Sequence, residues 1–286
     1  MWKKLAHRCA EMINNWRDYP LQPGTVWQGR YRIEKMLGMG SYGQAYLCLD
    51  QASNELVLLK RNKPSKGKTG IALLRRESEL MGTLDHPQIP KWLHYGKRNR
   101  DEALIMEYIE GYNLEQVIYE QNETYTAEQA LKLLEALLEP LRYLHERGYV
   151  HRDVRIPNVL IRNGAVYLID LGLACGIGEE LPNDLRLALG EDSGAMYGAA
   201  IKRRMRSANI ASDWFGLGHL FLFAMYAGYT PPDDAEERSW EEELILEPEV
   251  KAFARKLLND ENAWETTEQC EQELKSLLAQ LGTKQT

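Results

Sequence analysis

The segment HRDVRIPN, residues 151–158, places charged and amide side chains between two apolar runs, YV before it and VLI after it. Asp153 and Asn158 lie in this segment, and Asp170 follows at the end of a later apolar run, VYLID. A positioned carboxylate can accept a proton from a reacting hydroxyl. Carboxylate and amide oxygens are also ligands that hard divalent cations prefer. These three residues are therefore the first candidates for chemistry in this chain.

A glycine pattern and an ion-pair candidate precede this segment. Gly38, Gly40 and Gly43 form G-x-G-x-x-G between two predicted strands, where a simple glycine hairpin would ordinarily be the favoured interpretation. No helix follows directly, so the pattern does not fit a dinucleotide-binding βαβ unit. Lys60 ends an apolar strand 17 residues after Gly43, and Glu77 follows 17 residues later on a predicted helix. Each signal alone is weak, and their order gives them weight.

The elements that must position these residues change in character along the chain. Alternating apolar residues predict strands over 31–37, 44–50, 56–60 and 102–109, separated by turns rich in glycine and Asn or Asp. A helix is expected over 70–84. Short connections between these strands indicate hairpins, so we expect an antiparallel sheet in this part of the chain.

The chain is mainly helical from Thr126 onward. Thr126 is expected to cap a helix over 127–147, with Gln129 in the capping-box position and Gly148 ending it. Two short strands after the HRDVRIPN segment are joined by Asn163-Gly164, which is a strong signal for a type I′ hairpin.

Composition and charge exclude several classes of protein. The 286 residues are 44% hydrophobic and 27% charged, which is typical of a soluble globular chain. A net charge of −7 argues against nucleic acid as a partner. The four cysteines are far apart and predict neither a disulfide framework nor a zinc site, so we expect a cytoplasmic protein. The longest apolar stretch, 214–229, is too short to span a membrane and is expected to form a buried helix.

In this order, the motifs resemble the eukaryotic-like (Hanks-type) serine/threonine protein kinases, in a stand-alone bacterial form, over roughly residues 31–280. The resemblance implies an α+β, bilobal protein kinase fold. It places a small β-rich lobe with one helix at 31–109 and a large helical lobe at 110–281, after an amphipathic helical extension within 1–20. The extension at 2–17 could dock on the small lobe, or make weak peripheral contact with an anionic membrane or a partner.

The resemblance also implies a function, which is transfer of the γ-phosphate of ATP to Ser or Thr hydroxyls of protein substrates, possibly including the kinase itself. The required cofactors would be ATP and Mg²⁺, with Mn²⁺ possible. Asp153 would act on the hydroxyl proton, with Lys60, Arg155 and Asn158 as further catalytic residues. Asn158 and Asp170 would bind the metal. The implied ATP-binding residues are Leu37, Gly38, Gly40, Gly43, Ala45, Leu58, Lys60, Glu77, Met106, Glu107, Ile109 and Leu160.

Several positions depart from the family pattern. Arg155 stands where serine/threonine kinases usually carry Lys, and the two side chains differ in geometry. Ala45 stands at a position where the family usually has Val, and Leu58 stands where it usually has Ala. The smaller side chain at the first position is compensated by the larger one at the second. Ile201 and Trp264 replace a usual Glu and Arg, which are the two partners of a buried ion pair. We therefore expect Ile201 and Trp264 to be in contact.

Two alternatives follow from the departures. The missing A-P-E motif, Leu58, and Gly194 at a usual Thr position leave open a kinase-fold module that binds ATP and transfers phosphate weakly or not at all. A phosphotransferase for small molecules is the other alternative. The basic run of Lys202, Arg203, Arg204 and Arg206 is either a solvated helix face or a recognition site for an acidic substrate or anion.

Overall fold

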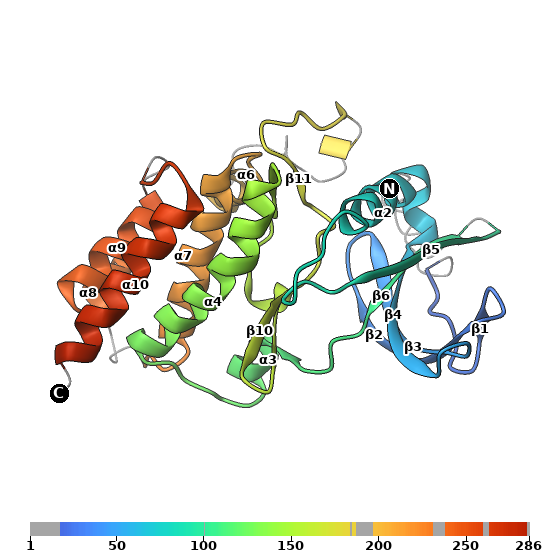
Figure 1. Cartoon of the computed structure of the whole chain (residues 1–286), viewed down its shortest axis with the longest axis horizontal. Helices are drawn as coiled ribbons and strands as arrows, with labels where there is room; N and C mark the ends of the chain where they lie inside the picture. The colour runs from blue at the N-terminus through green and yellow to red at the C-terminus, as the bar shows by residue number, and fades with distance from the viewer. Residues whose placement is uncertain are drawn as a thin grey trace, which may run out of the picture. The chain divides into compact units, whose positions relative to one another are not determined.

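The computed structural model describes residues 18–99, 101–183, 185–186, 197–230, 238–259 and 263–284. The chain divides into two compact units (Figure 1). The N-terminal unit comprises Met1–Ile109 with Asn183–Ala188, and the C-terminal unit comprises Glu110–Pro182 with Leu189–Thr286. The first is built on a sheet and the second mainly on helices, which confirms the expected α+β class. The expected helix over 2–17 lies outside the described residues.

The N-terminal unit contains an antiparallel sheet of six strands in the order β1-β2-β3-β4-β6-β5. The strands are β1 (Val26–Trp27), β2 (Tyr31–Met39), β3 (Gly43–Asp50), β4 (Glu55–Asn62), β5 (Trp92–Arg98) and β6 (Asp101–Glu107). Successive side chains of a strand point to opposite faces of the sheet, so apolar residues at alternate positions lie together on one face. That set forms the core of the sheet and includes Tyr46, Cys48, Val57, Leu59 and Ile105.

Helix α2 (Gly67–Met81), the one long helix among the described residues of the N-terminal unit, packs on β4 and β6. It begins three residues before the expected start because a 3-10 turn, η1 (Pro64–Lys66), leads directly into it. Gly67 joins the two with φ +49°, which glycine adopts without steric cost. Asp18 fixes this turn, since its carboxylate accepts hydrogen bonds from the Ser65 amide and hydroxyl at 2.8 and 2.6 Å.

The helices of the C-terminal unit pack in a layered group, with α4 against α7 and α10, and α7 against α9 (Figure 1). They are α3 (Leu114–Tyr119), α4 (Ala127–Glu146), α6 (Tyr197–Met205), α7 (Ile210–Tyr226), α8 (Trp240–Glu243), α9 (Pro248–Asn259) and α10 (Thr267–Lys284). The capping box of Thr126 and Gln129 is confirmed at the start of α4. Among the described residues, no helix is long and apolar enough to cross a membrane.

Helix α7 is the buried centre of this unit. It begins at Ile210 rather than at the expected 214, because the Asn209 side chain accepts a hydrogen bond from the Ser212 amide and caps the helix. Gly216 lets α7 approach the HRDVRIPN segment. A Cβ at this position would lie 2.7 Å from the Val154 carbonyl oxygen. Only glycine therefore allows this separation between helix and segment.

Short strands and a 3-10 turn position the candidate residues of the C-terminal unit. They are β7 (Tyr112–Asn113), β8 (Tyr149–Val150), η2 (Ile156–Asn158), β9 (Val159–Arg162), β10 (Ala165–Leu168) and β11 (Cys175–Gly176). β9 and β10 form the expected hairpin, with Asn163 at φ 51° and Gly164 at φ 80° in its turn. The pair Val159–Leu168 closes the ladder at its open end.

Candidate functional site

The carboxylate of Asp153 is held by its own loop. Asn158 Nδ2 donates to Asp153 Oδ2 at 2.7 Å, and Arg155 Nε donates to the same oxygen at 3.1 Å. Asn158 Nδ2 also donates to the Asp153 backbone carbonyl at 2.9 Å, which fixes the distance between the two residues. Within the described residues, both side-chain donors use Oδ2. Oδ1 is therefore the oxygen that can accept a proton from outside the loop.

Asn158 and Asp170 lie on either side of the open end of the β9–β10 hairpin. The Ile169 amide donates to the Asn158 carbonyl oxygen at 2.9 Å, so the two flanking segments run side by side. Because the amide nitrogen of Asn158 serves as the donor to Asp153, its side-chain oxygen faces another direction. Asp170 is exposed, has φ 64°, and accepts from the Gly172 amide at 3.2 Å.

This donor set fits a divalent cation of the hard type. One carboxylate and one amide oxygen on neighbouring segments are what Mg²⁺ uses when substrate phosphates and water complete its coordination. The described residues contain no group of three or more His, Cys, Asp or Glu side chains that could hold a metal by themselves. A cation at Asn158 and Asp170 would therefore need ligands from a bound phosphate compound.

A buried carboxylate in α7 supports the backbone just before Asp153. Asp213 is fully buried, and it accepts hydrogen bonds from the His151 amide at 2.8 Å and the Arg152 amide at 2.7 Å. Burial alone would raise the pKa of Asp213, but the hydrogen bonds that it accepts from the His145 ring and the His151 amide lower it. Arg152 has φ 65°, a conformation that a non-glycine residue adopts only where its surroundings enforce it.

The ring of His151 is enclosed in the same loop, with no exposed surface. Its Nδ1 accepts a hydrogen bond from the Asp153 amide at 3.3 Å, so the proton resides on Nε2, which lies 3.2 Å from the Ile169 carbonyl oxygen. His151 therefore joins the start of the loop to the strand end beside Asp170. Its role is structural.

The N-terminal unit contains the expected ion pair. Lys60 Nζ on β4 lies 2.7 Å from Glu77 Oε1 on α2, and the Glu77 side chain is 2% exposed. A buried carboxylate holds the ammonium group with which it pairs in one position, since losing a partner of a buried ion pair is costly. Gly43 lies against this pair, because a Cβ there would come within 3.7 Å of the Lys60 side chain and 3.2 Å of the Arg61 carbonyl oxygen.

The sheet register brings several of the expected ATP-binding residues to one face. Ala45 pairs with Lys60, and Leu58 pairs with Met106, so these four side chains project from the same side of the sheet. Gly38 pairs with Ala45 on the neighbouring strand. The exchange of a small for a large residue at Ala45 and Leu58 therefore occurs within one surface.

The remaining expected residues are placed separately. Leu37 is 39% exposed, and the Gly40 amide closes the β2–β3 turn on the Gly43 carbonyl oxygen at 2.9 Å. Glu107 ends β6, with its amide bonded to the Lys91 carbonyl oxygen, and Ile109 is buried two residues later. Leu160 belongs to the C-terminal unit, in β9.

One contact of the N-terminal unit could not be inferred from the sequence. Trp92 at the start of β5 donates through its indole N–H to Ser78 Oγ on α2 at 2.8 Å. Ser78 adjoins Glu77, so this bond ties α2 to the sheet beside the residue that pairs with Lys60. No motif connects Trp92 with Ser78, because they meet only through tertiary packing.

The basic run on and after α6 is divided in the structure. Lys202 and Arg203 are exposed, whereas the guanidinium of Arg204 lies over the Phe215 ring at 4.3 Å. Arg206 accepts a hydrogen bond through its backbone carbonyl oxygen from Arg152 Nε at 2.6 Å. The four residues therefore do not form one uniform exposed surface.

Trp264 lies in a cluster of aromatic rings. Its ring contacts Trp214 and Phe253, with centroids 5.4 and 5.5 Å apart, and its indole N–H donates to Glu273 Oε2 at 2.9 Å. At the position of the usual Arg, this chain therefore has an aromatic side chain that packs against other aromatic rings. A contact with Ile201 stays a prediction, and Gly194 lies outside the described residues.

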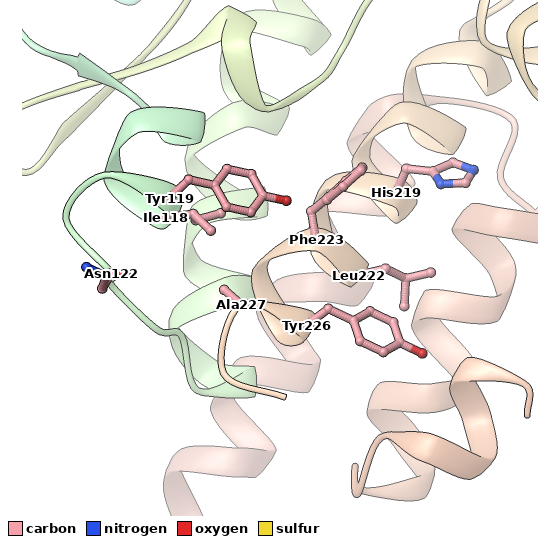
Figure 2. A pocket seen from close by; sticks show the side chains of 8 residues that line it. All are labelled: Ile118, Tyr119, Asn122, His219, Leu222, Phe223, Tyr226 and Ala227. Atoms are coloured by element: carbon pink, nitrogen blue, oxygen red, sulfur yellow. The ribbon is translucent and has the colours of Figure 1, made fainter. Parts of the chain in front are cut away.

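A cavity of about 460 Å³ lies elsewhere in the C-terminal unit. Figure 2 shows that it is bordered by α3 with the chain after it and by α7. Its lining residues are Ile118, Tyr119, Asn122, His219, Leu222, Phe223, Tyr226 and Ala227. The lining contains no carboxylate, lysine or arginine, so this cavity does not suit a phosphate group or a metal ion, and it is separate from the candidate site at Asp153.

The Ser78–Trp92 bond is expected to stabilise the N-terminal unit measurably. In a double-mutant cycle of Ser78→Ala and Trp92→Phe, the coupling free energy of unfolding should be about 1 kcal/mol, the net contribution of one partly buried hydrogen bond. Urea unfolding followed by circular dichroism measures it. As a control, Ser276→Ala on α10 should be additive with Trp92→Phe. Additivity of Ser78→Ala with Trp92→Phe would contradict the expectation.

Comparison with known proteins agrees with this geometry. The model of the protein kinase domain family matches residues 31–286. The probable serine/threonine-protein kinase YbdM of Bacillus subtilis is 31% identical, over 90% of this chain and 93% of that protein. The probable serine/threonine-protein kinase PknB of Lactococcus lactis is 28% identical over 74% of this chain, and the serine/threonine-protein kinase PrkC of B. subtilis is 28% identical over 72%. The chain covers about a third of each of these two proteins, 34% and 31%.

The matched region includes both the Lys60–Glu77 pair and the Asp153 loop, and it comprises more than half of the chain. The family's use of ATP and a divalent metal suits the donor set at Asn158 and Asp170. Together with the sheet of the first unit and the helices of the second, this makes the chain a member of the protein kinase family, with the fold and the relatives of a serine/threonine kinase.

Proposed function

We propose that this protein kinase transfers the γ-phosphate of ATP to Ser or Thr hydroxyls of protein substrates, with Asp153 as the residue that accepts or orients the hydroxyl proton. The arrangement of the Asp153 carboxylate supports this most directly. Two donors converge on Oδ2 while Oδ1 is left for an external hydroxyl. A general base must be both within reach of the proton and held in position, and this loop provides the second condition.

Nucleotide binding is assigned residue by residue. Lys60, paired with Glu77, would hold the α- and β-phosphates, and Gly38, Gly40 and Gly43 would let the β2–β3 turn approach phosphate oxygens. The remaining positions would contact the adenine and ribose, with backbone groups of Glu107 and Ile109 bonding the adenine edge. These positions are Leu37, Ala45, Leu58, Met106, Glu107, Ile109 and Leu160.

Asn158 and Asp170 would hold the divalent metal, for which we propose Mg²⁺, with Mn²⁺ able to substitute. A bound cation neutralises phosphate charge and orients the transferred group. Asn158 serves two purposes here, since its amide nitrogen bonds Asp153 while its oxygen is available as a ligand. The hairpin spacing supports this assignment, because it keeps Asn158 and Asp170 on adjacent segments.

Arg155 would contact the γ-phosphate in place of the usual lysine. Its Nε is bonded to Asp153 Oδ2, and the side chain is 53% exposed. A guanidinium is a planar fork with several donors, so the two terminal nitrogens can bind a phosphate oxygen while Nε stays on the carboxylate. A lysine offers a single nitrogen for both partners.

Removal of the proposed base or of the phosphate-binding lysine should abolish transfer. With labelled ATP and Mg²⁺, and with the kinase itself and a generic protein as acceptors, Asp153→Asn and Lys60→Met should each lower the rate at least about 100-fold. The control Lys132→Met, on the exposed side of α4, should leave it unchanged. Phosphoamino-acid analysis should show phosphoserine or phosphothreonine.

Two outcomes would contradict this assignment. If wild type and both variants transfer equally little while ATP still raises the melting temperature, the protein is an ATP-binding module without transfer. Phosphotyrosine as the only product would exclude Ser/Thr specificity. At present no comparison favours the module, since the relatives cited above are named as kinases.

The identity of residue 155 gives a second test. Arg155→Ala should lower kcat about ten-fold or more, because the transferred phosphate loses a charged hydrogen-bond donor, whereas Arg155→Lys should retain most of the activity. Steady-state kinetics at saturating ATP measure both. Arg162→Ala, which removes an exposed arginine at the end of β9, is the control. Full activity in Arg155→Ala would show that the γ-phosphate is bound by other groups.

We further propose that the basic run favours substrates with acidic residues or another anion. All four residues, Lys202, Arg203, Arg204 and Arg206, contribute positive charge, but of these only Lys202 and Arg203 are exposed. Exposed charges act mainly through long-range attraction that salt weakens. The selective effect should therefore reside in this exposed pair.

A double variant can separate substrate recognition from general damage. Lys202→Gln with Arg203→Gln should raise KM about five-fold for a peptide with acidic residues around its serine, and should leave KM for a neutral peptide unchanged. The difference should vanish in high salt. Lys132→Gln is the matched control for loss of a surface charge. Equal KM ratios for the two peptides in wild type and variant would establish the basic run as an ordinary solvated surface.

A further inference from the structure

Thr267, the first residue of α10, is buried and bonded to two side chains that belong to other helices. It is 3% exposed, and its Oγ1 lies 2.6 Å from His145 Nδ1 on α4 and 3.3 Å from Trp214 Nε1 on α7. A threonine at the start of a helix usually caps that helix, but here the neighbouring Thr266 accepts from the Gln269 amide instead. The hydroxyl of Thr267 is therefore directed away from its own helix.

With a neutral His145 ring, the donors and acceptors in this group all point in one direction. An indole N–H can only donate, so Trp214 donates to Thr267 Oγ1 and leaves the hydroxyl proton for another partner. His145 Nδ1 lies 2.6 Å away and accepts that proton when the nitrogen carries none of its own. Nε2 of His145 consequently carries the ring proton, and it lies 2.8 Å from Asp213 Oδ2. The bonds run in one direction, from Trp214 through Thr267 and His145 to the carboxylate.

The carboxylate at the end of this chain supports the catalytic loop. Asp213 accepts from the amides of His151 and Arg152, immediately before the proposed base Asp153. With the opposite tautomer of His145, a nitrogen lone pair would face the Asp213 oxygen and repel it. The tautomer of His145 thus influences which orientation of the carboxylate is stable, and the hydroxyl of Thr267 determines the tautomer.

We propose that Thr267 is a positioning residue for phosphoryl transfer. It holds His145 as the Nε2–H tautomer and thereby fixes the orientation of the Asp213 carboxylate, which binds the backbone amides of the catalytic loop. Its effect on activity rests on the proposed function of Asp153. The effect on the loop does not, because the bonded chain exists whether or not phosphate is transferred. Helix α10 thus influences the catalytic loop indirectly, through His145 and Asp213.

The conformation of Arg152 makes the loop sensitive to this support. Its φ of 65° is maintained by surrounding contacts, of which the bond from its amide to Asp213 Oδ1 at 2.7 Å is the closest to the strained backbone. A carboxylate that is free to rotate would weaken this bond and relax the backbone beside Asp153. Misplacement of a catalytic group lowers the chemical step more than it lowers substrate binding.

Three variants test the role of Thr267 in catalysis. Thr267→Val keeps the shape and removes the hydroxyl, so kcat should fall about five-fold or more while KM for ATP stays within about two-fold. Thr267→Ser restores the hydroxyl and should return kcat to within about two-fold of wild type. Thr266→Val, which removes the cap of α10 at the adjacent exposed position, should lower the melting temperature without lowering kcat at a permissive temperature.

Two readouts are independent of activity. The ¹⁵N shifts of His145 in the wild type should identify the Nε2–H tautomer, and hydrogen exchange of the Arg152 amide should accelerate about ten-fold in Thr267→Val but not in Thr266→Val or Thr267→Ser. A wild-type protein without transfer activity would refute the proposed function and leave these measurements decisive for Thr267.

Any of three results would overturn the proposal. One is a proton on Nδ1 of His145 in the wild type, which needs no variant and so holds even if Thr267→Val fails to fold. The second is a folded Thr267→Val protein with wild-type kcat and wild-type exchange at Arg152. A loss of kcat that Thr267→Ser does not restore would likewise assign the residue a packing role only.

Discussion

The structure of the C-terminal unit depends on one buried carboxylate. Asp213 is surrounded by protein, and an ionised group in that position is tolerated only when each of its oxygens is hydrogen-bonded. Two backbone amides and the His145 ring provide those bonds. The relation is mutual, because the amides of His151 and Arg152 would each lose a hydrogen bond if Asp213 were absent. Helix and loop therefore hold each other in place, and the lowered pKa of Asp213 is the electrostatic sign of it.

The two units solve the same physical problem with different means. In the N-terminal unit, a buried carboxylate on a helix holds a cationic side chain that projects from the sheet. In the C-terminal unit, a buried carboxylate on a helix holds backbone amides, which orient a second carboxylate that must stay accessible. In each case a buried carboxylate determines the position of a group to which we assign a role in phosphoryl transfer. Electrostatic preorganisation of this kind is what phosphoryl transfer requires of a protein.

The sequence indicated the local groupings and the Lys60–Glu77 ion pair well, but other contacts between distant segments poorly. Asp153, Arg155 and Asn158 are neighbours in the chain, so their convergence follows from a single short loop. The capping box at Thr126 and the Asn163-Gly164 turn are likewise local signals, and both are confirmed. The early start of α2 was missed because a 3-10 turn can extend a helix without changing the apolar pattern.

Contacts between distant segments depend on packing that no motif records. Ser78 and Trp92 meet because β5 returns beside α2. Thr267 and His145 are separated by 122 residues, and neither lies in a motif that predicts their contact. Arg204 was expected to be part of an exposed basic run, but its guanidinium lies over the Phe215 ring in a cation–π contact. Such outcomes are decided by tertiary context, and a single sequence contains little information about them.

The β9–β10 hairpin has a consequence for how this site can vary between proteins. Asn158 and Asp170 flank the open end of the hairpin, whereas the turn at Asn163-Gly164 lies at the far end. Residues added in pairs at the turn would lengthen both strands and leave the first pair, Val159–Leu168, in register. The number of residues between Asn158 and Asp170 can therefore change while the ladder keeps their separation in space the same.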